Sequence, residues 1–406
     1  MFEIVCGKAG EIMWERIILH CDLNNFFASV TLLENQTLCD LPVAVCGSKA
    51  ERHGIVLAKN EKAKAFGVKT AEAIWQAQQK CPDLVILPPD YKKYEQFSAA
   101  ARAIDARYTD KIEPFGIDEC WLDVTGSTLL FGSGEEIAHR IRRDIKRELG
   151  ITISVGVSFN KVFAKLGSDM KKPDAVTVIP PDGFREMIYH LPVCDLLFAG
   201  RKTGEKLNSM GVFSIGDLTL ISDETLSRAL GVNGLELKRY ALGLDRSPVA
   251  DMNAHTPPKS IGKSITGAED FKNNDEVWQS ILSLSEEISE KLRREQLYAG
   301  GVQVHIRDSN LTTREPTRAL KTPTDSALLI AEQAMDIFIE NYYWEIPLRS
   351  IGVRAVNLKK DQGAEQTDIF SDARLNEKRE IIEDSIHSIR EKYGKNSLKR
   401  GTTVKK

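Results

Sequence analysis

The feature that most constrains the fold is a change of pattern along the chain. Strand-like runs such as RIILHCD (16–22) and ITISVGVSF (151–159) alternate with segments of helical spacing up to residue 180. Strands are then absent over 183–245, and the alternation returns after residue 258. With 406 residues, the chain has room for about two to four domains. The sequence therefore predicts an α+β multidomain protein with a small helical block between two mixed ones.

The second mixed block has a recognisable order of elements. A strand in KSIGKSITGAEDF precedes a long helix near 273–297, two strands follow, and a helix near 325–343 leads to a final strand in RSIGVRAVNL. The order βαββαβ predicts a compact two-layer domain. The stretch LDRSPVADMNAHTPPKS (244–260) before it carries three prolines and no clear periodicity, which is typical of a linker.

Composition excludes some classes of protein. The net charge of −3 is not that of a strongly basic nucleic-acid binder, although binding depends on local patches rather than on totals. Seven scattered cysteines without a CxxC pair indicate a reducing, cytoplasmic setting in which the thiols act as small core residues. No apolar run approaches the ~18 residues of a membrane span, and the first residues lack the apolar block of a signal peptide.

Adjacent acids interrupt the apolar run FGIDECWLD (115–123). A buried carboxylate is costly unless a counter-charge accompanies it, yet Asp118 and Glu119 stand side by side there, and Asp22 ends the apolar strand RIILHCD. Carboxylates at strand ends are suitable ligands for Mg²⁺, and two such ions can promote phosphoryl transfer. These residues therefore predict a magnesium site.

The acidic doublet also has a simpler interpretation. Neighbours on a regular strand point to opposite faces, so Asp118 and Glu119 can share a site only at a turn or bulge, for which Gly116 could supply the bend. The alternative is a solvated hairpin tip that carries two surface acids, and the spacing by itself leaves both interpretations open.

Three motifs in order resemble one family. HCDLNNFFASV, GIDECWLDVTG and SVGVSFNKVFAKLGSDMKKP are similar to motifs of the Y-family DNA polymerases, of the bacterial DNA polymerase IV type, and the similarity extends over residues 14–358. The resemblance implies a right-hand fold. Its expected parts are an N-terminal extension (1–13), the palm (14–31 and 89–182), the fingers (32–88), a helix-hairpin-helix-like thumb (183–247), the linker (248–258), a βαββαβ little finger (259–358) and a tail (359–406).

The resemblance also implies roles for residues of the palm. Asp22, Asp118 and Glu119 correspond to the catalytic, metal-binding carboxylates, and the carbonyl of Leu23 would add a ligand to one of two Mg²⁺ ions. Phe27 stands where the family places a steric gate, an aromatic ring that would clash with a ribose 2′-hydroxyl. Without the motif, the favoured explanation of Phe27 is a core aromatic on a helix, along with Phe26.

Contacts to the incoming nucleotide are implied as well. Lys172 corresponds to a lysine that meets the triphosphate, which suits a compact ammonium group. Many relatives carry a Tyr and an Arg in the finger helix, where this chain has Glu61 and Lys64. Lys64 can still meet a phosphate, without a bidentate fork. Glu61 cannot donate to a phosphate, so Asn60 is the expected substitute.

DNA and a protein partner are expected to bind elsewhere. In the thumb, FAGRKTG keeps Gly200 but has Phe198 where relatives often have a first glycine, and backbone contacts to DNA phosphates are expected over Gly200, Arg201, Lys202 and Thr203. The segment QTDIF resembles the peptide by which such polymerases bind the sliding clamp. Its expected contacts come from Gln366, Ile369 and Phe370.

These features together predict template-directed synthesis of DNA. The family implies a monomeric translesion polymerase with low fidelity and no proofreading, acting in DNA repair on primer-template DNA and deoxynucleoside triphosphates, with no membrane association. Two alternatives remain at this point. A nucleotide cyclase could use similar carboxylates, and a non-catalytic, clamp-bound module could bind DNA without reacting.

Overall fold

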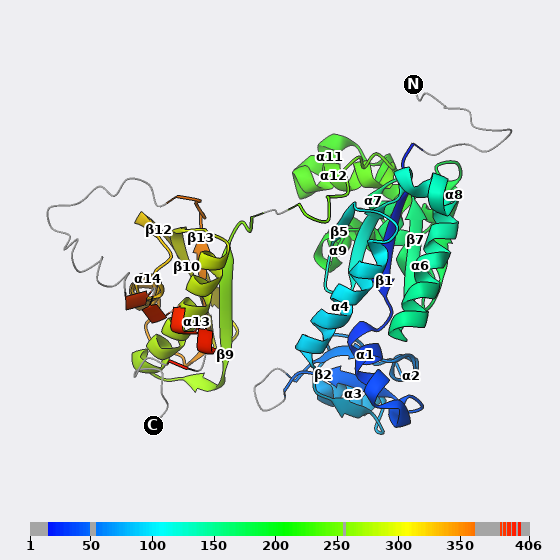
Figure 1. Cartoon of the computed structure of the whole chain (residues 1–406). Helices are drawn as coiled ribbons and strands as arrows, with labels where there is room; N and C mark the ends of the chain where they lie inside the picture. Colours follow the sequence, from blue (N-terminus) through cyan, green and yellow to red (C-terminus); the bar gives the residue numbers. More distant parts are fainter. Residues whose placement is uncertain are drawn as a thin grey trace. The chain divides into compact units, whose positions relative to one another are not determined.

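The computed structural model describes residues 15–48, 54–254 and 257–361, with separate positions between 382 and 398. The expected N-terminal extension (1–13) and clamp segment (366–370) lie outside the described residues. The chain divides into two compact units, of which the first reaches Ala254 and the second begins after it. Each unit combines helices and strands (Figure 1), so the predicted α+β class is confirmed.

The sheet of the expected palm is built around the fully buried strand β1 (Ile18–Leu23). Its order is β5 (Ile112–Pro114), β6 (Glu119–Asp123), β1 (Ile18–Leu23), β7 (Ile153–Ser158) and β8 (Val176–Val178). The central strand β1 is antiparallel to both β6 and β7, and every one of its residues is buried. A strand that is covered on both faces reads as a continuous apolar run, as RIILHCD does.

Helices cover the two faces of this sheet. Leu19, Cys21 and Leu23 of β1 share a core with α4 (Tyr91–Asp105) and α6 (Gly134–Leu149). His20 and Asp22, which alternate with them, instead contact side chains of α7 (Lys161–Met170). The alternation follows from the two-residue period of a strand. It places His20 and Asp22 on one face, and that face carries the candidate site.

The fingers form a small separate layer. The strands pair in the order β3-β2-β4, and their core contains Val56, Ala63, Ile74 and Leu84. Asn60 caps α2 by accepting a hydrogen bond from the backbone N–H of Ala63. The elements of this region are α1 (Phe26–Glu34), η1 (Gln36–Leu38), β2 (Val43–Cys46), β3 (Val56–Lys59), α2 (Glu61–Ala65), α3 (Ile74–Lys80) and β4 (Val85–Leu87).

The expected thumb is helical throughout its described length. Its helices share an apolar core with α7, through Phe163 and Leu166 among others. They are α8 (Phe184–Ile188), η3 (Val193–Asp195), α9 (Arg201–Ser209), α10 (Ile215–Leu220), α11 (Asp223–Leu230) and α12 (Val232–Ala241). Two further short helices, η2 (Thr125–Ser127) and α5 (Thr128–Phe131), precede α6 in the palm.

Part of the expected linker is attached to the palm. Val249 is buried against Ile18 and Trp121, and the backbone N–H of Ala250 donates to the Glu113 carboxylate at 3.0 Å. The first compact unit accordingly extends through Ala254. The apolar side chain of Val249 explains why this proline-containing stretch adheres to the sheet.

The second unit has the predicted two-layer arrangement. Its sheet has the order β11-β10-β13-β9, with β12 also paired to β10, and its core joins the sheet to two long helices. The predicted strand in TREPTRALKT is split at Pro316, which has no N–H for the ladder. The elements are β9 (Ile261–Phe271), α13 (Asn274–Arg294), β10 (Ala299–Asp308), β11 (Thr313–Arg314), β12 (Thr317–Thr324), α14 (Ala327–Asn341) and β13 (Leu348–Val356).

Two smaller expectations can be compared with the described residues. Within them, no helix has the length and apolar character needed to cross a membrane. Four of the described cysteines are buried, as expected, but Cys39 and Cys194 are exposed, so the expectation that every thiol is a core residue is wrong for these two.

Candidate active site

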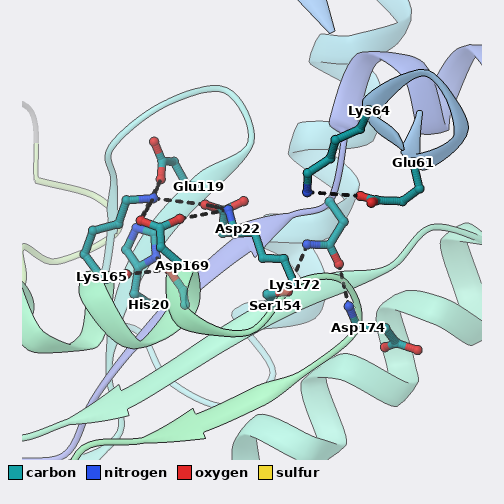
Figure 2. A network of polar contacts seen from close by, with 12 residues as sticks. His20, Asp22, Glu61, Lys64, Glu119, Ser154, Lys165, Asp169, Lys172 and Asp174 are labelled. Atoms are coloured by element: carbon teal, nitrogen blue, oxygen red, sulfur yellow. Dashed lines mark hydrogen bonds and ion pairs between the residues drawn. The ribbon is translucent and has the colours of Figure 1, made fainter. Parts of the chain in front are cut away.

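Two of the predicted carboxylates meet across neighbouring strands. Asp22 of β1 is paired in register with Glu119 at the start of β6. Both side chains lie on the face that α7 covers, and Figure 2 shows them pointing toward the same lysine. Residues almost a hundred positions apart in the sequence are thus brought together by the sheet.

A bend before β6 presents the acidic doublet. Residues 115–118 form the bend, and the backbone N–H groups of Phe115 and Gly116 donate to the carbonyl of Glu119 at 3.0 and 3.3 Å. The backbone φ of Gly116 is not positive; what glycine provides is space, because a Cβ there would lie 3.3 Å from Cγ of Glu119. The doublet is at a hairpin tip, but Asp22 beside it is buried, so this is not a solvated surface feature.

Asp118 is oriented differently from Glu119. It lines a narrow space together with Glu119, Asp105 and Cys120. Burial, and then the charges of Asp22 and Glu119, raise the pKa of the Asp118 carboxyl. Among the described residues its oxygens are outside the set of donor atoms that lie within 4.8 Å of one another. Asp118 lies in the bend before β6, so it is not part of the strand pairing that joins Asp22 to Glu119.

Two lysines of one helix neutralise the carboxylates. The Lys165 ammonium lies 3.0 Å from Oδ2 of Asp22 and 2.5 Å from Oε2 of Glu119. The Lys172 ammonium is 2.9 Å from both Asp22 and Asp169. Burial opposes the charged form of each lysine, but the carboxylates outweigh it and raise the pKa of both. Both lysines are therefore cationic counter-charges at neutral pH.

The loop that carries Lys172 is fixed from β1. The Asn24 amide donates to the Ser154 hydroxyl at 2.9 Å, and its oxygen accepts from the backbone N–H of Asp174, also at 2.9 Å (Figure 2). Asn24 is buried. Its two bonds tie the segment after α7 to β7 and to the residue that follows β1, which holds the backbone of this segment close to the strand that carries Asp22.

A buried histidine completes the polar group. His20 has no solvent exposure, its Nδ1 is 2.9 Å from the Ser168 hydroxyl, and its Nε2 is 3.4 Å from Oε2 of Glu119. Burial, followed by the charges of Lys165 and Lys172, holds the pKa of His20 well below its usual value, so the imidazole is neutral. One donor atom each from His20, Asp22 and Glu119 lie within 4.8 Å of one another.

The donor set fits a divalent cation. Four acids, Asp22, Asp118, Glu119 and Asp169, face two lysines, so the local formal charge is negative even with both ion pairs made. Carboxylate oxygens are the preferred ligands of hard divalent cations. Burial is the largest cause of the raised pKa of Asp118, the charges of Asp22 and Glu119 add to it, and a bound cation would oppose both effects.

The predicted gate residue lies beside the site on α1. The ring of Phe27 stacks on Tyr94 with 4.1 Å between centroids and meets Tyr91 edge-on at 5.8 Å. Its neighbour Phe26 is buried, whereas Phe27 is only partly covered. Phe26 is therefore part of the core, and Phe27 packs against that core while remaining partly accessible.

The residues of the fingers that were predicted to contact phosphate already make contacts with other residues of the protein. Lys64 lies 3.6 Å from Glu61, which also accepts from the Asn25 amide at 2.9 Å. Asn60 is almost fully buried; its oxygen accepts from Val43 N and Ala63 N, and its amide donates to Leu41 O at 2.8 Å. Binding of a phosphate by Asn60 would break one of these bonds, so that assignment remains a prediction with a clear energetic cost.

The predicted DNA-binding turn precedes α9. Gly200 is the N-cap of this helix, and Arg201 and Lys202 are exposed beside it, whereas Thr203 is half-buried. Phe198 has a φ of 69°, in the left-handed region that favours glycine, and its side chain is 62% exposed. The backbone therefore keeps the shape that a glycine would adopt, although the residue is aromatic.

Sequence analysis missed His20, Lys165 and Asp169. A signal was present for each. His20 is two residues before Asp22, and on a strand this spacing places both side chains on one face. Lys165, Asp169 and Lys172 have the spacing i, i+4, i+7, which lies on one face of a helix and its extension.

Comparison with solved structures places the fold. A Y-family DNA polymerase chimera (Dbh-Dpo4-Dbh) superimposes with a TM-score of 0.75 at 24% identity, covering 85% of this chain and all of that one. The fold is thus that of the Y-family DNA polymerases, with palm, fingers, thumb and little finger, as the sequence predicted.

Comparison of sequences identifies the family. The impB/mucB/samB family model matches residues 21–169, and the model of that family's C-terminal domain matches residues 258–369. DNA polymerase IV of Acetivibrio thermocellus is 50% identical over 95% of this chain and 97% of its own length. DNA polymerase IV 1 of Bacillus subtilis is 35% identical over 96% and 94%. The chain belongs to the impB/mucB/samB family and is a DNA-directed DNA polymerase of the DNA polymerase IV type, which rules out both a cyclase and a non-catalytic module.

Proposed function

We propose that this polymerase extends a primer by two-metal phosphoryl transfer, with Asp22, Asp118 and Glu119 holding two Mg²⁺ ions. The observation that carries the proposal is the register pairing of Asp22 with Glu119, with Asp118 coupled to both by charge. When bound, the two ions would lower the pKa of the primer hydroxyl and neutralise the charge of the leaving pyrophosphate. The Leu23 carbonyl at the end of β1 is the expected additional ligand.

The side chains around the carboxylates have distinct tasks in this proposal. Lys172, held by Asp22 and Asp169, exchanges these partners for the triphosphate of the incoming nucleotide. Lys64 approaches the phosphates from the fingers, while Glu61 keeps it in place from the same helix. The Phe27 ring, seated on Tyr94, occupies the space that a 2′-hydroxyl would need.

Duplex DNA is proposed to bind at the thumb turn and at the second unit. The exposed Gly200, Arg201 and Lys202, with the half-buried Thr203, offer backbone N–H groups and positive charge to a phosphate. We further propose a monomer that lacks proofreading, copies with low fidelity and serves damage tolerance, because its relatives bear the name DNA polymerase IV. The sliding clamp is the proposed partner of Gln366, Ile369 and Phe370.

Primer extension tests the proposed mechanism. Wild-type protein is expected to extend a labelled primer on a template with Mg²⁺ and four deoxynucleotides, and Asp22→Asn and Glu119→Gln are expected to lose at least about a hundredfold in rate. Asp182→Asn, an exposed acid between β8 and α8, is the matched control and should extend normally. Absence of extension by the wild type would overturn the proposal, and normal rates in both site variants would remove the carboxylates from it.

A further inference from the structure

The side chain of His20 has one polar atom without a partner, and it faces the carboxylates. His20 is fully buried on β1, and its ring packs edge-on against Trp121 at 5.3 Å between centroids. Its Nε2 makes no hydrogen bond within the described part of the chain, although Oε2 of Glu119 is only 3.4 Å away. A buried nitrogen without a partner is costly, so it calls for a functional explanation.

The hydrogen bonds on the other side of the ring fix which nitrogen carries the proton. The Ser168 hydroxyl donates its single proton to the carbonyl of Lys165 at 2.7 Å. It therefore accepts at 2.9 Å from Nδ1–H of His20. A neutral imidazole has only one N–H, so Nε2 presents a bare lone pair to Glu119 and Asp22. This explains why the short distance to Glu119 is not a hydrogen bond.

We propose that Nε2 of His20 is a nitrogen ligand for a divalent transition-metal ion held with Asp22 and Glu119, in the same site that the proposed function assigns to Mg²⁺. One donor atom of each residue lies within 4.8 Å of the others. An octahedral ion with bonds of about 2.1 Å separates neighbouring donors by about 3 Å and opposite donors by about 4.2 Å, so the three atoms are near the required spacing.

The surroundings of His20 are those of a ligating histidine. Metal-bound imidazoles commonly donate their second N–H to a fixed acceptor, which sets the orientation of the ring. Here the Ser168 hydroxyl has this role and is itself bonded to the α7 backbone. Imidazole nitrogen is a typical ligand of transition-metal ions, whereas Mg²⁺ prefers oxygen. The histidine therefore favours transition-metal ions over Mg²⁺ at this position.

Lys165 is the side chain that must move when such an ion binds. Its ammonium contacts the same oxygens of Asp22 and Glu119, and a divalent cation there would repel it. Asp169, one turn further along α7 and 3.4 Å from the ammonium, offers an alternative partner. A change of rotamer, without backbone motion, is enough to clear the carboxylates.

Direct metal binding to the full-length protein tests the inference. Mn²⁺ is the probe, because pulsed EPR detects ¹⁴N coupling when a histidine nitrogen is bound to it. The wild type is expected to show this coupling, and His20→Gln to lose it together with about tenfold or more of its Mn²⁺ affinity by calorimetry. The Mg²⁺ affinity should change less. His139→Gln on α6, a partly exposed histidine away from the carboxylates, is the matched control and should resemble the wild type.

The outcomes separate this inference from the proposed function. Absence of nitrogen coupling in the wild type, or coupling that persists in His20→Gln, would show that His20 only packs against Trp121. The wild-type spectrum by itself shows whether a nitrogen is bound to Mn²⁺, even if the His20→Gln variant does not fold. Primer extension with Mg²⁺ is measured on the same samples: extension without coupling overturns only the His20 ligand, and coupling without extension overturns only the proposed mechanism.

Discussion

Individual side chains of the palm are held in place before any substrate arrives. Phe27 is seated by Tyr94 and Tyr91, and Asp22 by Lys165 and Lys172. Pre-positioned groups lose little freedom when substrate binds, which favours the reaction. Exchanging one such side chain should therefore change selectivity or pH behaviour more than overall structure.

Removal of the Phe27 ring should relax the choice of sugar. In Phe27→Ala, the space beside Tyr94 becomes free for a 2′-hydroxyl, and the ratio of ribonucleotide to deoxynucleotide incorporation is expected to rise at least about tenfold. Single-nucleotide extension with each substrate measures the ratio. Phe66→Ala, an exposed aromatic of the fingers, is the control. An unchanged ratio would contradict the assignment of Phe27 as gate.

Asp105 should make stability fall as the pH rises. Its carboxyl is buried behind β1 and β6, where desolvation raises its pKa to about 7, against the opposing effects of Cys120 and Arg102. The unfolded carboxyl titrates near pH 4, so between about pH 4 and 7 the folded state holds the extra proton. The free energy of unfolding is then expected to decrease with pH by up to about 1.4 kcal/mol per unit.

A neutral replacement tests this dependence. Asp105→Asn keeps an acceptor for the Cys120 thiol, which is 3.4 Å away. The variant should lose the decrease in the free energy of unfolding that Asp105 causes between about pH 4 and 7. Urea denaturation at several pH values gives the slope, with Asp182→Asn as control. Identical slopes for Asp105→Asn and the wild type would show that Asp105 does not titrate in this range.

The individual residues also show what sequence could predict. Asp22, Glu119 and Lys172 belong to motifs with fixed spacing, and the structure brings them together. The spacing of His20 and Lys165 shows which face of its own element each occupies, but one sequence does not reveal which face of α7 lies on which face of β1, so both were missed. Asn60 was assigned to a phosphate as the substitute for Glu61, and its bonds to residues 41 and 43 could not be read from spacing.

At the scale of elements, one close contact fixes the helix that carries both lysines. A Cβ on Gly156 of β7 would lie 1.9 Å from the backbone carbonyl oxygen of Ala164, so α7 rests directly on the strand. The sequence pattern predicted the strand over 151–159 and the helix that follows it, but not the order of the strands in the sheet. The contact was not, because glycine in a strand also marks bulges.

Gly156→Ala should displace α7. The methyl group has no space against a backbone atom, and a loss of about 3 kcal/mol or more in the free energy of unfolding is expected. Displacement would also separate Lys165 and Lys172 from Asp22, so primer extension by the folded fraction should fall. Gly126→Ala, where nothing lies within 4 Å, is the matched control. Wild-type stability in Gly156→Ala would contradict the close contact.

At the scale of the whole molecule, the two units have separate hydrophobic cores. The sequence predicted this division from the proline-rich stretch and from the return of the strand pattern. It did not predict that Val249 in this stretch packs against the first unit, because the burial of Val249 depends on the tertiary position of Ile18 and Trp121. A partner that binds the C-terminal tail could therefore recruit the enzyme without altering the palm.

Loss of two apolar side chains should abolish that recruitment. Ile369→Ala combined with Phe370→Ala is expected to weaken binding to the sliding clamp at least about tenfold, because a few buried side chains dominate such interfaces. Surface plasmon resonance on immobilised clamp measures the affinity. Ile389→Ala, another apolar residue of the tail, is the control. Equal affinities for the double variant and the wild type would eliminate the segment as a clamp ligand.

The turn before α9 has a consequence for engineering. A left-handed backbone at Phe198 costs about 1 kcal/mol or more that glycine would not incur, and its benzyl group is largely exposed. A designer who seeks heat resistance would therefore replace this residue early. If the stabilised variant then dissociated from duplex DNA faster than the wild type, the Phe198 ring would be a DNA contact that is retained at a cost in stability.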